Sequence, residues 1–225
     1  MYGLGQKGAR VLREYGHLIN HRVDWSEKNK RAGNLFIAHT IEVADFLIRL
    51  ELACRNSGDI GFIGEEEILA LAAERTQVAR EPLRWEAVSV EQGRRELWSV
   101  IPDGIFGLSF EDGSASYFML KVDRGTIPIN RNRADHRSIA RKFKTYFDGW
   151  RAGRHVEQFG LKQMRVATVT NSRERMQNMI AIVRRITDGK GSNFFLFIDQ
   201  AKLGQSNPLE AQWVTVKGDR VKLGD

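Results

Sequence analysis

Short apolar runs separated by turn residues occupy the middle of the chain. Residues 105–110 and 117–122 form two such runs, and the Asp112-Gly113 pair between them is typical of a tight turn that joins antiparallel strands. Two further runs precede them and are separated by a turn at residues 92–93. The pattern therefore predicts an antiparallel meander, with strands over residues 85–90, 96–101, 105–110 and 117–122.

Helical periodicity lies on both sides of this block, in residues 9–21, 35–55, 65–80, 138–150 and 172–186. Ser138 and Ser172 are predicted to cap the last two of these helices. Continuous apolar runs at residues 164–170 and 194–198 are typical of buried strands, and with the helix between them they predict a parallel crossover. A short hairpin around Gly218 should follow at the sheet edge. The order indicates an α/β fold in which helices flank a mixed sheet. No glycine-rich turn joins a strand to a helix, which excludes a dinucleotide-binding domain.

Three charged residues should meet beside two of the predicted strands. Side chains two positions apart on a strand share a face, so Lys121 and Asp123 should project beside Met119 and opposite to Leu120. Asp103 precedes the neighbouring strand and should lie near them. Two converging carboxylates are suited to Mg²⁺, and a lysine beside them could neutralise charge on a phosphate. The same residues are also compatible with a plain turn and a solvated ion pair.

Positive charge is concentrated in one segment of the chain. The sequence has a formal net charge of +7 and a pI of about 9.7, which favours an anionic partner. Residues 124–154 hold two Asp and nine Lys or Arg, namely Arg124, Arg131, Arg133, Arg137, Arg141, Lys142, Lys144, Arg151 and Arg154. A basic patch beside an acidic site is typical of a nucleic-acid enzyme. Lipid headgroups would be attracted to the same charge, but the segment lacks an apolar face suited to a membrane surface.

The single cysteine, Cys54, excludes a disulfide within the chain and favours a cytoplasmic location. Residues 35–54 are apolar-rich but are interrupted by charged residues such as Asp45, which is typical of a buried amphipathic helix and not of a membrane span. On the same predicted helix, His39 and Glu42 share a face. They could assist a metal ion or form a hydrogen-bonded pair.

A set of motifs spans most of the chain: Tyr2-Gly3-Leu4 with Gly8, residues 39–45, Pro102-Asp103-Gly104, residues 120–126, residues 138–146 and residues 165–170. Together they resemble the plasmid replication-relaxation family and, more broadly, the restriction-endonuclease-like PD-(D/E)xK nucleases. The resemblance implies a winged-helix DNA-binding domain followed by a nuclease-like domain. Residues 1–31 would be a winged-helix remnant with a linker helix, residues 32–204 the nuclease-like α/β domain, and residues 205–225 an edge hairpin or tail.

The resemblance also implies roles for individual residues. The family carries an acid where this sequence has Lys121, so the acid-x-lysine order of the superfamily is reversed in Lys121-Val122-Asp123. Asp123 could bind Mg²⁺ while Lys121 contacts the phosphate, or Glu42 could supply a carboxylate and Lys142 the cation. The implied catalytic set is Asp103, Lys121, Asp123, Lys142 and Glu42, with Asp103, Asp123 and Glu42 as metal ligands. The implied DNA contacts are Arg124, Arg137, Arg141, Lys142 and Lys144.

Three functions follow from these expectations. The first is a DNA-associated protein of plasmid replication that nicks or relaxes DNA as a Mg²⁺-dependent phosphodiesterase. The second is a DNA-binding module with a nuclease fold and a degenerate site. The third is a protein-interaction domain of a plasmid replication complex, in which the basic patch binds an acidic partner.

Overall fold

A computed structural model describes residues 34–91, 93–125, 138–188 and 193–224, together with residues 10, 11 and 14. The chain divides into two compact units, Met1–Glu42 and Val43–Asp225. In the first unit, residues 10, 11 and 14 are helical, as predicted, and helix α3 (Asn34–Ser57) begins. The other residues of the predicted winged-helix remnant lie outside the described residues, and the predicted division into domains stays a prediction.

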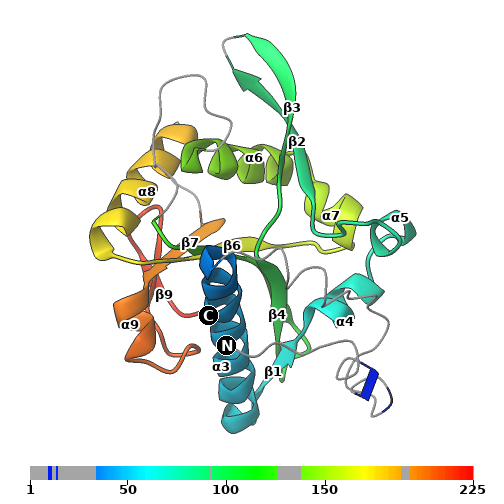
Figure 1. The fold of residues 1–225 in the computed structure, drawn as a ribbon, viewed down its shortest axis with the longest axis vertical. Coiled ribbons are helices and arrows are strands. Elements are labelled where there is room, and N and C mark those ends of the chain that lie inside the picture. Colours follow the sequence, from blue (N-terminus) through cyan, green and yellow to red (C-terminus); the bar gives the residue numbers. More distant parts are fainter. Residues whose placement is uncertain are drawn as a thin grey trace. The chain divides into compact units, whose positions relative to one another are not determined.

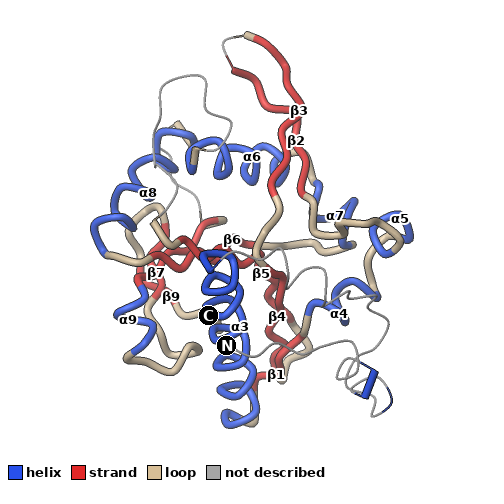
Figure 2. The backbone as a smooth tube through the Cα atoms, in the orientation of Figure 1, coloured by secondary structure: helices blue, strands red, loops and turns tan. Residues whose placement is uncertain are grey.

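A seven-stranded mixed sheet forms the centre of the second unit (Figures 1 and 2). Strands β5, β6 and β7 are parallel, and every other neighbouring pair in this sheet is antiparallel. The strands in spatial order are β1 (Ile60–Ile63), β4 (Gly104–Phe110), β5 (Ala115–Asp123), β6 (Arg165–Thr170), β7 (Phe195–Asp199), β8 (Trp213–Thr215) and β9 (Arg220–Val221). The predicted mixed sheet is therefore confirmed, including the parallel crossover and the C-terminal edge hairpin.

The turn between β4 and β5 has the predicted chemistry. Gly113 adopts φ 79°, in the left-handed region that glycine enters without steric cost, and its N–H donates to the carbonyl of Phe110 at 3.0 Å. The N–H of Ser114 donates to Oδ1 of Asp112 at 2.9 Å. This turn fixes the register in which Gly104 pairs with Leu120.

The alternation along β5 separates two hydrophobic cores. Met119 belongs to the core under helices α6 (Ile139–Arg151) and α8 (Arg173–Ile186), whereas Leu120 belongs to the opposite core, under residues of α3 and α9 (Gln200–Gly204). Both α6 and α8 begin at a serine N-cap, as the sequence predicts: Ser138 accepts from the N–H of Arg141, and Ser172 accepts from the N–H of Arg175. Lys121 and Asp123 share the face of Met119 and so point toward α6 and α8.

The first two predicted strands of the meander do not join the main sheet. They form a separate two-stranded sheet of β2 (Trp85–Glu91) and β3 (Arg94–Val100), which packs against α6 (Figure 1). Trp85 is fully buried, and its Nε1 donates to the carbonyl of Thr145 at 3.2 Å. The buried indole ring therefore attaches the hairpin to α6.

Four further elements differ from the prediction. The expected helix over residues 65–80 is two short helices, α4 (Glu65–Ala70) and α5 (Glu74–Gln77), because the N–H of Ala73 between them donates to the carbonyl of Gln158 at 3.3 Å. Helix α7 (Arg154–Phe159), helix α9 and edge strand β1 were not predicted, and all three are too short for a clear periodic signal.

No helix in the described part of the chain is both long enough and apolar enough to cross a membrane.

Candidate functional site

Asp103 lies beside the C-terminal half of β5, as predicted. It immediately precedes β4, and its N–H donates to the carbonyl of Leu120 at 2.8 Å. Its Oδ2 accepts two hydrogen bonds, from Nζ of Lys121 at 2.7 Å and from the N–H of Val122 at 2.7 Å. The backbone of both strands therefore fixes this carboxylate where it meets Lys121.

Lys121 and Asp103 form a nearly buried ion pair. Their side chains are 11% and 14% exposed, respectively. Nζ of Lys121 also donates to the carbonyl oxygen of Val122 at 3.3 Å. The ammonium group is thus held by a carboxylate oxygen and a carbonyl oxygen, the oxygen types that a hard metal ion would bind.

Asp123 is engaged by a second cation, Arg175 in the first turn of α8. Nη2 of Arg175 donates to Oδ1 at 3.0 Å, and Nε donates to Oδ2. The hydroxyl of Thr170 and the N–H of Gly125 also donate to Oδ2, at 3.3 and 3.2 Å. Both oxygens of this buried carboxylate therefore accept hydrogen bonds from the protein.

Helix α6 brings Lys142 and Tyr146 to the same place. Burial lowers the pKa of Lys142, nearby Lys121 lowers it further, and Asp103 and Asp123 partly offset this effect. Burial raises the pKa of Tyr146 well above its usual value, and the charge of Asp103 adds to the effect. The Tyr146 hydroxyl has no hydrogen-bond partner among the described residues.

We call Asp103, Lys121, Asp123, Lys142 and Arg175 the charged cluster. It brings together four of the five predicted catalytic residues and holds three cations and two carboxylates. The fifth, Glu42, lies on α3 in the first compact unit, so its predicted contribution stays a prediction.

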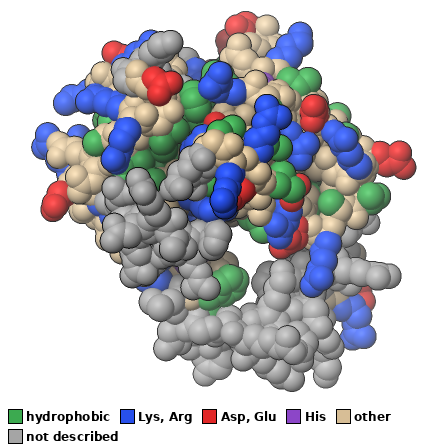
Figure 3. All heavy atoms as spheres, turned by 90° about the horizontal axis from the view of Figure 1, so that it is seen from above, with side chains coloured by type: hydrophobic (Ala, Val, Ile, Leu, Met, Phe, Trp, Pro, Cys, Tyr) green, Lys and Arg blue, Asp and Glu red, His purple; other side chains and the backbone are tan. Residues whose placement is uncertain are grey.

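The described members of the predicted DNA-contacting set have different local partners, and their role in binding DNA stays a prediction. Arg141 lies over the ring of Trp98, 3.8 Å from its centroid, and Lys144 donates to Asp148 at 2.7 Å. Arg124 directly follows β5, and Arg137 lies outside the described residues. Figure 3 likewise shows Lys and Arg side chains spread over one face of the molecule, among hydrophobic and acidic ones. Of these predicted contacts, only Lys142 is placed in the charged cluster.

The predicted metal site has few potential ligands among the described residues. Within the described ranges, no set of three or more His, Cys, Asp or Glu side chains is arranged to hold a metal ion. The predicted ligands Asp103 and Asp123 each accept hydrogen bonds from a cationic side chain.

Sequence reasoning missed Arg175, Thr170 and Tyr146 as members of this site. One signal was available, because Thr170 ends a predicted parallel strand and Arg175 lies in the first turn of the helix that follows it. Carboxyl ends of adjacent parallel strands meet at one edge of a sheet, and here Asp123 and Thr170 are register partners.

Comparisons with known proteins yield one match. A search of curated proteins and a search of solved structures found none. A family model described as replication-relaxation matches residues 1–164, which include Asp103, Lys121, Asp123 and Lys142. Arg175 lies beyond the matched residues. Because the match covers most of the sequence, the chain belongs to the replication-relaxation family.

Proposed function

We propose that this chain is a DNA-binding module of plasmid replication and relaxation, and that its charged cluster binds a backbone phosphate through Lys142. One observation carries the proposal: both carboxylates of the cluster are already paired with a cation, whereas Lys142 forms no ion pair with any described residue. Family membership supports the replication theme.

The charge of the cluster favours an anion. Lys121, Lys142 and Arg175 outnumber Asp103 and Asp123 by one. Burial and the neighbouring ammonium of Lys121 disfavour the charged form of Lys142, which lowers its pKa. A phosphate beside Lys142 would stabilise that charged form and return its pKa toward the ordinary value. Binding of phosphate would therefore offset the unfavourable free energy of holding the Lys142 charge in a buried position beside Lys121.

The same contacts do not fit Mg²⁺. An ion at Oδ2 of Asp103 would compete with the ammonium of Lys121, and an ion at Asp123 would compete with the guanidinium of Arg175. It would also approach a cluster that already has an excess of positive charge. A metal-dependent phosphodiesterase related to the PD-(D/E)xK nucleases is the second candidate. It is favoured by one observation, namely that two carboxylates reach one cluster from neighbouring segments of the sheet.

Fluorescence anisotropy with a labelled DNA duplex tests the first candidate. Affinity should fall as salt rises, because phosphate contacts release counterions. Lys142→Met keeps the apolar stem and removes the charge, so it should weaken binding to all sequences and reduce the salt slope by about one. Lys202→Met, at an exposed position on α9, is the matched control and should bind as the unmodified protein does.

Two results would overturn the DNA-binding proposal. One is an affinity for DNA that does not change with salt, which would favour a protein partner. The other is equal binding by the Lys142→Met and Lys202→Met variants. Nicking of supercoiled plasmid in Mg²⁺ that is lost in Asp103→Ala would instead establish the phosphodiesterase.

A further inference from the structure

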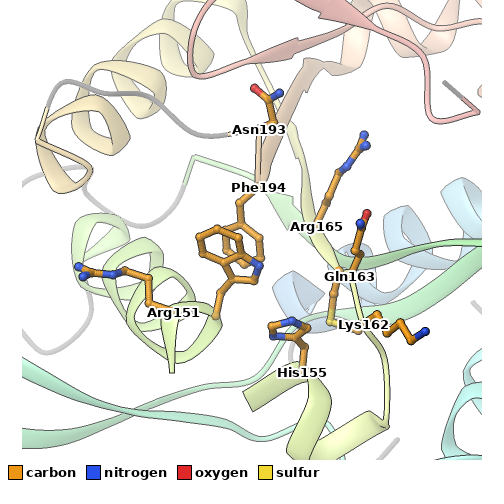
Figure 4. Close-up of a pocket in the computed structure, with 9 residues that line it drawn as sticks. Arg151, His155, Lys162, Gln163, Arg165, Asn193 and Phe194 are labelled. Atoms are coloured by element: carbon orange, nitrogen blue, oxygen red, sulfur yellow. The ribbon is translucent and has the colours of Figure 1, made fainter. Parts of the chain in front are cut away.

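A second candidate site lies at the opposite end of β6 from the charged cluster. Arg165 begins this strand and Thr170 ends it, so the two sites are about 17 Å apart along the strand at roughly 3.3 Å per residue. At the Arg165 end is a pocket of about 590 Å³, lined by residues from α6, α7 and the segments before β6 and β7 (Figure 4). This volume lies in the range of roughly 300–1,000 Å³ that is usual for small-molecule sites.

The described lining of the pocket carries positive charge and no negative charge. Arg151, Lys162 and Arg165 line it, and none of its nine described lining residues is acidic. None of these three side chains forms an ion pair with a residue that the structure describes. Some other cations of this unit are paired, such as Arg154 with Glu157 at 3.2 Å. Figure 4 shows Arg151 on one side of the aromatic rings, and Lys162 and Arg165 on the other. Uncompensated like charges around one cavity favour an anionic ligand.

An aromatic pair and a buried nitrogen accompany these cations; Phe194 is 4% exposed and Trp150 is half-buried. Trp150 and Phe194 line the pocket and stack on each other, with ring centroids 5.1 Å apart and planes inclined by 23°. His155 is 8% exposed, and its Nδ1 has no hydrogen-bond partner among the described residues. Burial lowers the pKa of His155, which favours the neutral ring, and a hydrogen bond with the backbone of Lys162 partly opposes this shift. In the neutral ring, an unprotonated Nδ1 accepts a hydrogen bond from a ligand N–H group.

We propose that this pocket binds a nucleotide, with its phosphate held by Arg151, Lys162 and Arg165 and its base lying against Trp150 and Phe194. A phosphate alone would use the cations but would make no use of the aromatic pair. A nucleobase supplies a planar apolar face and N–H donors that could reach Nδ1 of His155. The same chemistry is offered by a free nucleotide and by one unit of single-stranded DNA. The proposal rests on residues outside the charged cluster and is therefore independent of the phosphate site at Lys142.

Calorimetric titration of the full chain with dAMP, adenosine, inorganic phosphate and an oligo-dA strand tests the proposal. We expect dAMP to bind more tightly than either adenosine or phosphate. Arg165→Glu should weaken dAMP binding about tenfold or more, because it replaces a charge-assisted contact by repulsion. Lys202→Glu makes the same charge change at an exposed position on α9 and should leave affinity within about twofold.

The oligonucleotide distinguishes the two sources of the ligand. If oligo-dA binds more tightly than dAMP and Arg165→Glu removes the difference, the pocket binds single-stranded DNA. If oligo-dA and dAMP bind with equal affinity, the pocket binds free nucleotides. If inorganic phosphate binds as tightly as dAMP, the proposal is overturned. It is also overturned if the Arg165→Glu and Lys202→Glu variants bind dAMP with equal affinity. A titration of ¹⁵N-histidine signals gives a second measurement, because Nδ1 of His155 should shift with dAMP and not with phosphate.

Discussion

Arg175 forms a two-contact ion pair with Asp123: Nη2 of the guanidinium donates to Oδ1 of the carboxylate at 3.0 Å, and Nε donates to Oδ2. The pair joins the first turn of α8 to the end of β5, across a sequence separation of 52 residues. The Asp123 side chain is 3% exposed, so its charge depends on the protein and not on water for its stabilisation. Arg175 lies outside the residues that match the family model, so the charged cluster combines matched and unmatched parts of the chain.

Removal of the Arg175 charge should be strongly destabilising. Arg175→Met leaves a buried carboxylate without its cation, and the free energy of unfolding in urea should fall by about 3 kcal/mol. Arg84→Met breaks the exposed pair with Glu81 and should cost much less, because solvent screens an exposed pair. Adding Asp123→Asn to Arg175→Met should recover part of the loss, since the uncompensated charge is then gone. Equal losses in the Arg175 and Arg84 variants would contradict the buried-pair interpretation.

Lys142 should make stability depend on pH. Its pKa is lowered in the folded protein, so between that value and its ordinary value the unfolded chain binds more protons, and stability rises with pH in this window. We compare the unfolding free energy of the unmodified protein with that of the Lys142→Met variant. The difference, unmodified minus variant, should increase as the pH rises toward the ordinary lysine pKa of about 10.4. Urea titrations at several pH values measure this difference. A difference that does not change with pH would show that burial imposes no penalty on the Lys142 charge.

Gly149 should not accept a side chain. A Cβ at this position would lie 2.3 Å from Nε1 and 2.7 Å from Cε2 of the buried Trp85 ring. Because the indole also donates to the carbonyl of Thr145, it has little freedom to move, and Gly149→Ala should lower stability by about 1–3 kcal/mol. Gly204→Ala on α9 meets no atom within 4 Å and is the control, expected to retain its melting temperature. A Gly149→Ala protein as stable as this control would mean that the hairpin can move away from α6.

Cys54 should react slowly while the protein is folded. Burial raises the pKa of its thiol to about 11, so very little thiolate forms near neutral pH. Because it is the only cysteine, alkylation by iodoacetamide can be followed as a single mass increase. We expect slow modification at mildly alkaline pH and fast modification in urea. Equal rates in the two conditions would contradict the burial of Cys54 in the core beside β4 and β5.

The sequence predicted the elements whose local signals are strong. The turn at Asp112-Gly113 and the caps at Ser138 and Ser172 lie where expected, because each depends on a few neighbouring residues. The expected helix over residues 65–80 is interrupted at Ala73 by a bond to Gln158, a partner 85 positions away that no local pattern indicates. The roles predicted for the site residues stay predictions.

Strand alternation has a period of two residues, so the amino-acid pattern alone predicts the face on which Lys121 and Asp123 lie. It also predicts that Asp103 is near them, because a hairpin turn sets the register of the strands that it joins. The neighbours of these charges depend on long-range packing: α8 brings Arg175 to Asp123, and α6 brings Lys142 and Tyr146. Local geometry places a charged side chain, but its partners come from helices that pack on the sheet, and the positions of those helices depend on the whole core.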